Sequence, residues 1–140
     1  MEAYSRDGGH TWSSQYMCYC PGGPLVCNPR AANFVRKLQE GRYAGRFLYW
    51  FHNNNARGYD QGSRNPAWLL GGVEHDSPEG KVIHLGCPEV VLYDLNLLTG
   101  ISYPDFVEDG DRLFITETQK TVARVHEVPQ WLMSRLWNEE

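Results

Sequence analysis

The stretch "SRDGGHTW" places an acid, two hydroxyl-bearing residues and a tryptophan within eight consecutive positions. Asp7 in such a group could serve as a catalytic acid, or its carboxylate and the Ser5 hydroxyl could close a tight turn by bonding to the local backbone. The two glycines supply the positive φ angles that such a turn needs. The spacing favours the structural turn, after which we expect Trp12 to begin a strand and bury about 200 Å² in a sheet.

Asp105 and Glu117 are carboxylates in segments of β-forming composition. Either one could act as a general acid or base, or be an ordinary exposed acid on a strand. The histidines at 75, 84 and 126 are scattered and show no ligand spacing. We therefore expect neither a metal nor a cofactor.

Arg30 and Arg64 each adjoin an Asn-Pro pair. A rigid turn fixes the stem of a neighbouring arginine in advance, which suits the capture of an anion such as a sugar carboxylate by a bidentate guanidinium. The alternative is that both are solvated surface arginines.

The four cysteines are Cys18, Cys20, Cys27 and Cys87. On a strand, Cys18 and Cys20 would point to one face but along the chain, which disfavours a bond between them. Buried thiols that act as small apolar side chains are the simplest interpretation. A disulfide that uses Cys27 or Cys87 stays open.

These residues lie in a chain of 140 residues, about one domain in length. Its net charge of −4 and pI near 5.7 argue against a nucleic-acid partner. No apolar run approaches the roughly 18 residues of a membrane span, and the first residues lack the apolar core of a signal peptide. The compartment is left open.

Short β-forming segments separated by Gly, Pro, Asn and Asp predict about eight strands and an all-β fold. The expected segments are 12–20, 33–38, 46–52, 67–76, 82–85, 89–94, 102–108, 113–118 and 121–128. In the last of them the spacing of valines breaks strict alternation, so we expect a bulge there.

Two further segments have their own signals. The polar stretch 53–66 has no periodicity, which is typical of a functional or disordered loop. After Pro129 the sequence predicts a short helix with an apolar stripe. The stripe consists of Trp131, Leu132, Met133, Leu136 and Trp137.

The opening stretch matches every position of the Asp box, a turn that recurs in sialidase-type β-propellers; its residues are Ser5, Asp7, Gly9, Thr11 and Trp12. The stretches "NPRAANFVRKL", "RFLYWFHNN", "RNPAWLLGGVE" and "ISYPDFVEDGDRLFITETQKTVARVHEVP" resemble consecutive parts of sialidase-like glycosyl hydrolases with BNR repeats. The resemblance covers residues 5 to about 137. It implies that the Asp box lies on an outer hairpin, away from the catalytic cleft.

The same resemblance implies a partial β-propeller. A blade takes about 40–50 residues, judging by other propeller repeats, so the chain corresponds to roughly three antiparallel blades at the C-terminal portion of a propeller. Closed propellers have four to eight blades. An open arc exposes strand edges, so self-association through them is expected.

A sialidase-like site needs arginines that clamp the sugar, a tyrosine nucleophile with its activating glutamate, and an acid/base carboxylate. Tyr103, in "ISYPDFVEDGDRLFITE", matches the nucleophile, or else lines the cleft. His52 and Asn53, at the end of an aromatic strand, would face the cleft and bond sugar hydroxyls; a structural role for His52 is the alternative. The activating glutamate and a full set of clamp arginines are not identified, so the sugar is left open.

The resemblance thus implies a fragment of an exo-acting, sialidase-like glycoside hydrolase, expected to be inactive alone and to bind a carbohydrate. The first alternative is a non-catalytic module that binds carbohydrate or protein. The second is a propeller glycosidase that uses paired Asp and Glu side chains instead of a tyrosine.

Overall fold

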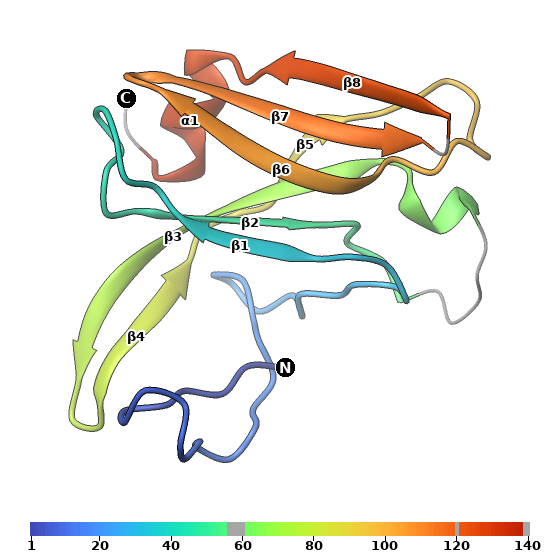
Figure 1. The fold of residues 1–140 in the computed structure, drawn as a ribbon. Coiled ribbons are helices and arrows are strands. Elements are labelled where there is room, and N and C mark those ends of the chain that lie inside the picture. The colour runs from blue at the N-terminus through green and yellow to red at the C-terminus, as the bar shows by residue number, and fades with distance from the viewer. Residues whose placement is uncertain (56–60, 120, 139–140) are drawn as a thin grey trace.

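The computed structural model describes residues 1–55, 61–119 and 121–138. In this part of the chain, eight strands form two antiparallel sheets, and one short helix follows them (Figure 1). The expected β-rich class and terminal helix are confirmed. The two sheets do not close into a ring. None of the described helices has the length and apolar character needed to cross a membrane.

The first sheet is a meander whose strands are neighbours in chain order: β1 (Phe34–Lys37), β2 (Phe47–Phe51), β3 (Ala67–Ser77) and β4 (Gly80–Leu85). β5 (Glu89–Leu92) also pairs with β3. β4 pairs with the second part of β3, from Gly72 to Ser77. β5 pairs with the first part of β3, from Ala67 to Leu69. β4 and β5 therefore form one edge of this sheet in two pieces.

The second sheet consists of β6 (Ser102–Asp109), β7 (Arg112–Gln119) and β8 (Val122–Glu127), again in chain order. The pairing of β7 with β8 is regular along its whole length. The bulge expected in residues 121–128 is therefore wrong, because unbroken pairing with β7 holds β8 in register. The irregularity lies in β6 instead, between Ser102 and Asp105.

The main core lies between the two sheets. Alternating side chains of both sheets turn toward each other, as the period of two along a strand requires. Phe34 of β1 packs on Phe106 of β6 with ring centroids 5.3 Å apart, and the Arg36 guanidinium lies 2.7 Å from the Asp105 carboxylate. The first strands of the two sheets are therefore neighbours. The most deeply buried core residues are Leu48, Trp50, Ala67, Leu69 and Ile115.

The helix α1 (Gln130–Leu136) completes this core with Leu132, Met133 and Leu136. Trp131, which the sequence placed in the apolar stripe of this helix, does not join the core, since its side chain is 62% exposed. At 100° per residue the three buried positions span one arc of the helix, and Trp131 falls outside that arc. Trp137 is half-buried, and its indole donates to the carbonyl of Gly72 over 3.2 Å.

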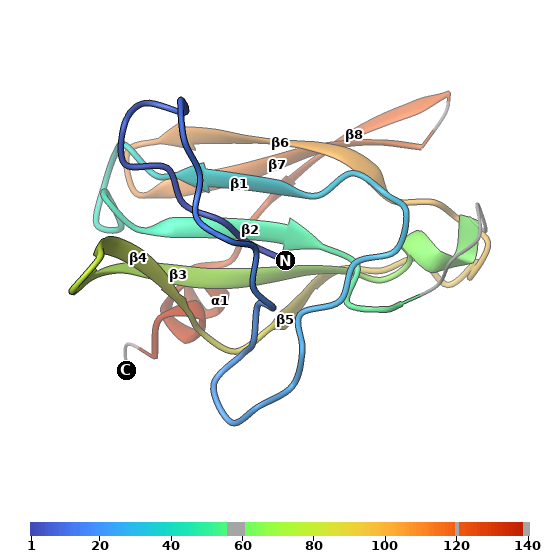
Figure 2. The same cartoon turned by 90° about the horizontal axis from the view of Figure 1, so that it is seen from below.

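Residues 1–33, which we call the N-terminal segment, lie over the other face of the first sheet (Figures 1 and 2). The strand expected at 12–20 is wrong: the described segment has only the isolated bridges Glu2↔Tyr16 and Tyr19↔Leu25. It lies across the sheet face rather than beside an edge, so no neighbouring strand extends its pairing. The molecule thus has three layers: the N-terminal segment, the first sheet and the second sheet.

A pocket of about 850 Å³ lies between the N-terminal segment and the first sheet. Its walls include Cys18, Cys27 and Arg30 from the segment, and Phe47 and Tyr49 from the sheet. The size is within the usual range of small-molecule pockets.

Candidate functional site

Tyr103 lies in a β-bulge at the start of β6. The register steps from Ser102↔Thr118 to Asp105↔Thr116, so Tyr103 and Pro104 together stand opposite Glu117. The backbone of Tyr103 is left-handed, with φ of 51°, and its side chain is 66% exposed. A non-glycine residue in this region costs roughly 1–3 kcal/mol, and such residues cluster at functional sites. The bulge therefore presents the phenol to solvent at a cost in backbone energy.

Arg64 is fixed beside this bulge. It ends the 3-10 helix η1 (Gln61–Arg64). Its Nη1 donates to the hydroxyl of buried Ser102 over 3.3 Å, and its carbonyl accepts the amide of Ile101 over 3.2 Å. Both ends of the arginine are thus attached to the two residues that precede Tyr103.

His52, which follows β2, also holds this strand. Its ring is only 1% exposed, and Nε2 lies 2.7 Å from the carbonyl oxygen of Ile101. A carbonyl only accepts, so Nε2 carries the proton and Nδ1 is a bare acceptor, for which the described residues supply no hydrogen-bond donor. Burial lowers the pKa of His52 below its ordinary 6.5, and the Arg64 charge lowers it further, whereas the bond to Ile101 opposes the shift.

The burial of His52 does not suit the expected direct contact with sugar hydroxyls. Its geometry fits a structural role, because it joins the end of β2 to the residue that leads into Ser102 and Tyr103. Asn53, the next residue, has a left-handed backbone with φ of 48° and is half-buried. Contact of Asn53 with a sugar stays a prediction.

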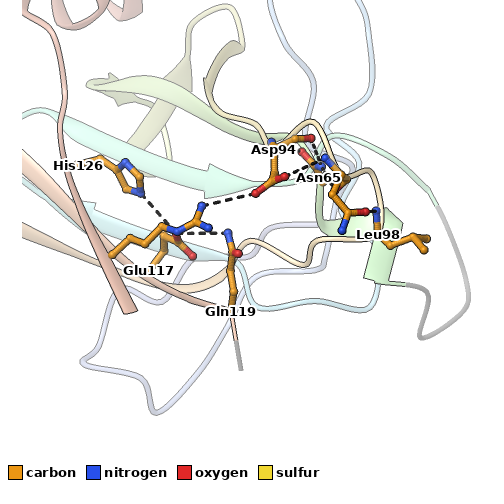
Figure 3. Close-up of polar contacts among 8 residues, drawn as sticks. Asn65, Asp94, Leu98, Glu117, Gln119 and His126 are labelled. Carbon is orange, nitrogen blue, oxygen red and sulfur yellow. Dashed lines mark hydrogen bonds and ion pairs between the residues drawn. The ribbon is translucent and has the colours of Figure 1, made fainter. Parts of the chain in front are cut away.

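Glu117 is a buried carboxylate on β7, with a side chain only 1% exposed (Figure 3). Its Oε1 lies 3.4 Å from Nε2 of His126, 3.5 Å from the Gln119 amide and 4.0 Å from Nε of Arg124. Its Oε2 is buried and has no hydrogen-bond partner within the described part of the chain. All three contacts are long for charge-assisted hydrogen bonds.

Arg124 connects Glu117 to the loop after β5. Its Nη1 lies 3.6 Å from Oδ2 of Asp94. The Asp94 carbonyl accepts the Asn65 side-chain amide over 2.8 Å, and the Asp94 backbone amide donates back to Asn65 Oδ1 over 3.1 Å (Figure 3). Asn65 follows Arg64 directly, so this chain of contacts runs from the second sheet back to the residues that flank the bulge.

We call these residues the strand-end site, because most of them lie where β2 and β7 end and β6 and β8 begin, on the right of Figure 1. Within it, the cationic Arg124 lies between the anionic Asp94 and Glu117. The members are His52, Arg64, Asp94, Tyr103, Glu117, Arg124 and His126.

Two predicted site residues lie elsewhere. Arg30 lines the pocket on the far face of the first sheet. Asp105 follows the bulge but is paired with Arg36 at 2.7 Å, with a side chain more than half exposed. Neither is brought into contact with Glu117 or His52 by a contact that the structure describes.

The Asp box forms a closed local turn. Asp7 accepts the Thr11 amide at 2.9 Å through Oδ1 and the Thr11 hydroxyl at 2.7 Å through Oδ2, and the Gly9 amide donates to Ser5 Oγ over 2.7 Å. The bonds from Thr11 lower the pKa of Asp7 to about 2. Every one of these bonds stays inside the octet, so its geometry is that of a structural turn.

The expected burial of Trp12 in a sheet is wrong. The indole is 64% exposed and donates to the carbonyl of Gly9 over 3.1 Å, so it folds back on its own turn. The Asp-box turn is joined to the sheet by other residues. The Tyr4 hydroxyl accepts the amide of Ile83 at 2.9 Å, and the Arg6 guanidinium donates to the carbonyl of Lys81.

Asp94 and Arg124 were not singled out from the sequence, and no partner was expected for His126. A signal was available for the last two. Gln119 pairs with Val122, which puts Arg124 opposite Glu117 and His126 opposite Ile115, and side chains two apart on a strand share a face. Counting along the two expected strands would have brought Arg124 and His126 to the face that carries Glu117. Nothing local in the sequence points to Asp94.

No family model matches this chain, and neither the curated proteins nor the solved structures contain a match. Among residues 1–55, 61–119 and 121–138, no group of three or more His, Cys, Asp or Glu side chains is arranged to hold a metal ion.

Proposed function

We propose that the two sheets are neighbouring blades of a sialidase-like β-propeller and that the strand-end site is part of the cleft of an exo-acting glycoside hydrolase. Two features support the blade assignment. Strands β1–β4 and strands β6–β8 each form a meander in chain order, and the first strands of the two sheets, β1 and β6, lie side by side. The N-terminal segment lies over the far face of the first sheet, and in this proposal it corresponds to a third blade.

The observation that carries the catalytic proposal is the bulge. It holds an exposed phenol in a strained conformation, and it puts that residue opposite a buried carboxylate in the register of the sheet. In the proposed reaction the phenol oxygen of Tyr103 attacks the anomeric carbon while the bond to the leaving group breaks. Glu117 takes the phenol proton, and the departing oxygen takes a proton from solvent. Water later attacks the anomeric carbon and breaks the glycosyl–tyrosine bond, the Tyr103 oxygen takes up a proton from that water, and Glu117 releases its proton to solvent.

Other members of the site have supporting roles in this proposal. Arg64, held next to Tyr103, binds an anionic or hydroxyl group of the sugar. His52 acts as a positioning residue through Ile101. Asp105 is engaged by Arg36, so we assign no residue to the protonation of the leaving group. A chain that lacks this acid is expected to bind a saccharide but to turn it over poorly.

The test compares the wild-type chain with Tyr103→Phe, using a panel of 4-methylumbelliferyl glycosides for turnover and saturation-transfer NMR with monosaccharides for binding. The proposal predicts binding by both proteins and, for any glycoside that is cleaved, a loss of turnover of at least about 100-fold in Tyr103→Phe. Turnover that survives in Tyr103→Phe would instead support paired carboxylates. Absence of both binding and turnover would refute a saccharide site.

A non-catalytic module is the second candidate, and the burial of Glu117 favours it, since a carboxylate that is 1% exposed has restricted access to a substrate. In that case a saccharide binds with the same affinity to wild type and Tyr103→Phe, and neither protein cleaves any glycoside of the panel.

A further inference from the structure

The N-terminal segment brings Cys20 onto the first sheet. Cys20 is buried and packs in a cluster with Phe51 and Leu70, to which Leu85 also belongs. These sheet residues lie on the face opposite the main core. Cys20 is therefore a thiol of one layer embedded in the apolar surface of the next.

Cys87 lies in the break between β4 and β5, on the same face. Leu85 pairs with Gly72, the Gly86 amide donates to the carbonyl of Gly71 over 2.7 Å, and Glu89 pairs with Leu69. This register leaves Cys87 and Pro88 together opposite Leu70. Leu70 belongs to the same buried cluster as Cys20, and Leu85 packs against that cluster. Cys87 therefore has one neighbour across the strands, Leu70, and one neighbour two residues earlier on its own strand, Leu85, at the Cys20 cluster.

The electrostatics agree with this placement. Burial raises the pKa of Cys20, and a charge on Cys87 raises it further. Cys18 and Cys27 instead line the pocket beneath the segment. All four cysteines are free thiols in the structure, and the two that line the pocket serve as internal comparisons for the other two.

We propose that Cys20 and Cys87 are a redox modification site that forms a reversible disulfide between the N-terminal segment and the first sheet. With a small disulfide such as oxidised glutathione as the oxidant, the exposed Cys87 thiolate attacks one glutathione sulfur and releases the other as a thiol. Cys20, deprotonated, then attacks the Cys87 sulfur and releases the second glutathione. The two cysteines lose two electrons and two protons, and the glutathione disulfide gains both.

The bond fixes one wall of the pocket. Tyr4 and Arg6 join the start of the N-terminal segment to the β3–β4 hairpin. These contacts lie at least 14 residues before Cys20 in the chain. A covalent link at Cys20 closes a long loop and restricts the detached states of the segment. The proposal is independent of the glycoside-hydrolase assignment, because the cysteines lie on the face of the first sheet away from the strand-end site.

The experiment treats the reduced full chain with oxidised glutathione, blocks remaining thiols by alkylation and maps linked peptides by mass spectrometry without reduction. Wild type and the control variant Cys27→Ser are expected to give the Cys20–Cys87 link, which dithiothreitol removes. Cys20→Ala and Cys87→Ser are expected to lack it. Limited proteolysis of the same samples should show cleavage within residues 1–33 slowed about tenfold by oxidation in the first two proteins and unchanged in the other two.

Two results would overturn the proposal. One is a dominant link between Cys18 and Cys27. The other is Cys87 that remains as a mixed disulfide with glutathione while Cys20 is alkylated. A Cys20–Cys87 link that leaves proteolysis of the N-terminal segment unchanged would support the disulfide but contradict its effect on that segment.

Discussion

Asp7 and Glu117 are two carboxylates that the fold treats in opposite ways. Asp7 is exposed, and both of its oxygens accept hydrogen bonds from Thr11 at 2.7 and 2.9 Å. Glu117 is buried, has contacts of 3.4 Å or longer through one oxygen, and has no described partner for the other. A carboxylate such as Asp7, whose hydrogen bonds all come from its own turn, has the structural role of holding that turn. A buried carboxylate without good bonds costs stability, so its presence needs another explanation, and a functional role supplies one.

The largest expected effect that tests this contrast is on ligand binding in Glu117→Gln. The amide keeps the shape of the side chain but removes its charge and its proton-accepting oxygen. We expect saccharide affinity to fall about 100-fold. The free energy of unfolding should stay the same or rise by about 1 kcal/mol, because the amide removes a buried charge whose long contacts contribute little. Isothermal titration and urea unfolding measure the two quantities.

The matched control is Glu127→Gln on the neighbouring strand, where an exposed carboxylate pairs with Arg112 at 2.9 Å. This variant should leave saccharide affinity unchanged. A loss of several kcal/mol in the stability of Glu117→Gln with unaltered affinity would make Glu117 a structural acid like Asp7 and remove the contrast.

The next effect is the pH dependence of the free energy of unfolding that His52 causes. The pKa of His52 is lower in the folded chain than the ordinary 6.5, so the unfolded chain binds the proton more readily between these two values. The stabilising contribution of the neutral ring is complete above about pH 6.5 and is lost as the pH falls toward the folded pKa. Urea unfolding from pH 8 to pH 5 measures this slope.

His52→Gln should remove that slope and lower stability by about 2 kcal/mol at pH 8, because a buried hydrogen bond is lost. His10→Gln, which changes an exposed residue of the Asp box, should keep the slope. Equal slopes in wild type and His52→Gln would show that the ring does not hold the strand that leads to Tyr103.

A smaller effect is expected at Tyr103. Glycine adopts a φ of 51° without strain, and the exposed phenol contributes little packing. Tyr103→Gly should therefore raise the free energy of unfolding by about 1 kcal/mol, measured by urea unfolding. Tyr103→Ala keeps the strain and serves as the control. If Tyr103→Gly were no more stable than Tyr103→Ala, strain at this position would no longer distinguish the site from ordinary loops.

The smallest expected effect is a local increase in amide exchange in Asp7→Asn. The weakened bonds to Thr11 are local and exposed, so amide exchange at Thr11 should accelerate while saccharide affinity stays the same. In wild type the protection of the Thr11 amide, measured relative to its intrinsic exchange rate at each pH, should be lost as the pH falls below the ordinary 3.8 toward about 2, where the carboxylate gains a proton. Asp76→Asn, an exposed acid on β3, is the control. Loss of saccharide affinity in Asp7→Asn would contradict the structural assignment of the Asp box.

The elements of the fold were readable in the sequence where one local pattern determines the outcome. Phe106, Leu113 and Ile115 follow the alternation of half-buried strands and occupy the main core. The bulge at Tyr103 was not readable, because nothing in "ISYPDF" tells which residue lacks a partner on β7. The position of the N-terminal segment depends on contacts such as Arg6 with Lys81, which join distant parts of the chain and leave no local pattern.

The candidate site was likewise predicted in part, since several of its residues could be found from the sequence but their placement in the fold could not. His52, Arg64, Tyr103 and Glu117 were all singled out from the sequence, and the structure brings them to one end of the two sheets. Their roles stay predictions. Arg30, chosen by the same turn argument as Arg64, lies on the far side of the first sheet, because an Asn-Pro turn fixes a local stem but not the place of that turn in three dimensions.

The most direct test of the saccharide site is a titration of the ¹⁵N-labelled chain with the monosaccharide that binds best, followed by backbone chemical-shift mapping. The account predicts shifts concentrated at residues 101–106 and 115–119 and at Arg64, with the Asp box and the walls of the pocket of about 850 Å³ unaffected. Shifts confined to residues 5–12, or to the pocket around Arg30 and Tyr49, would contradict it.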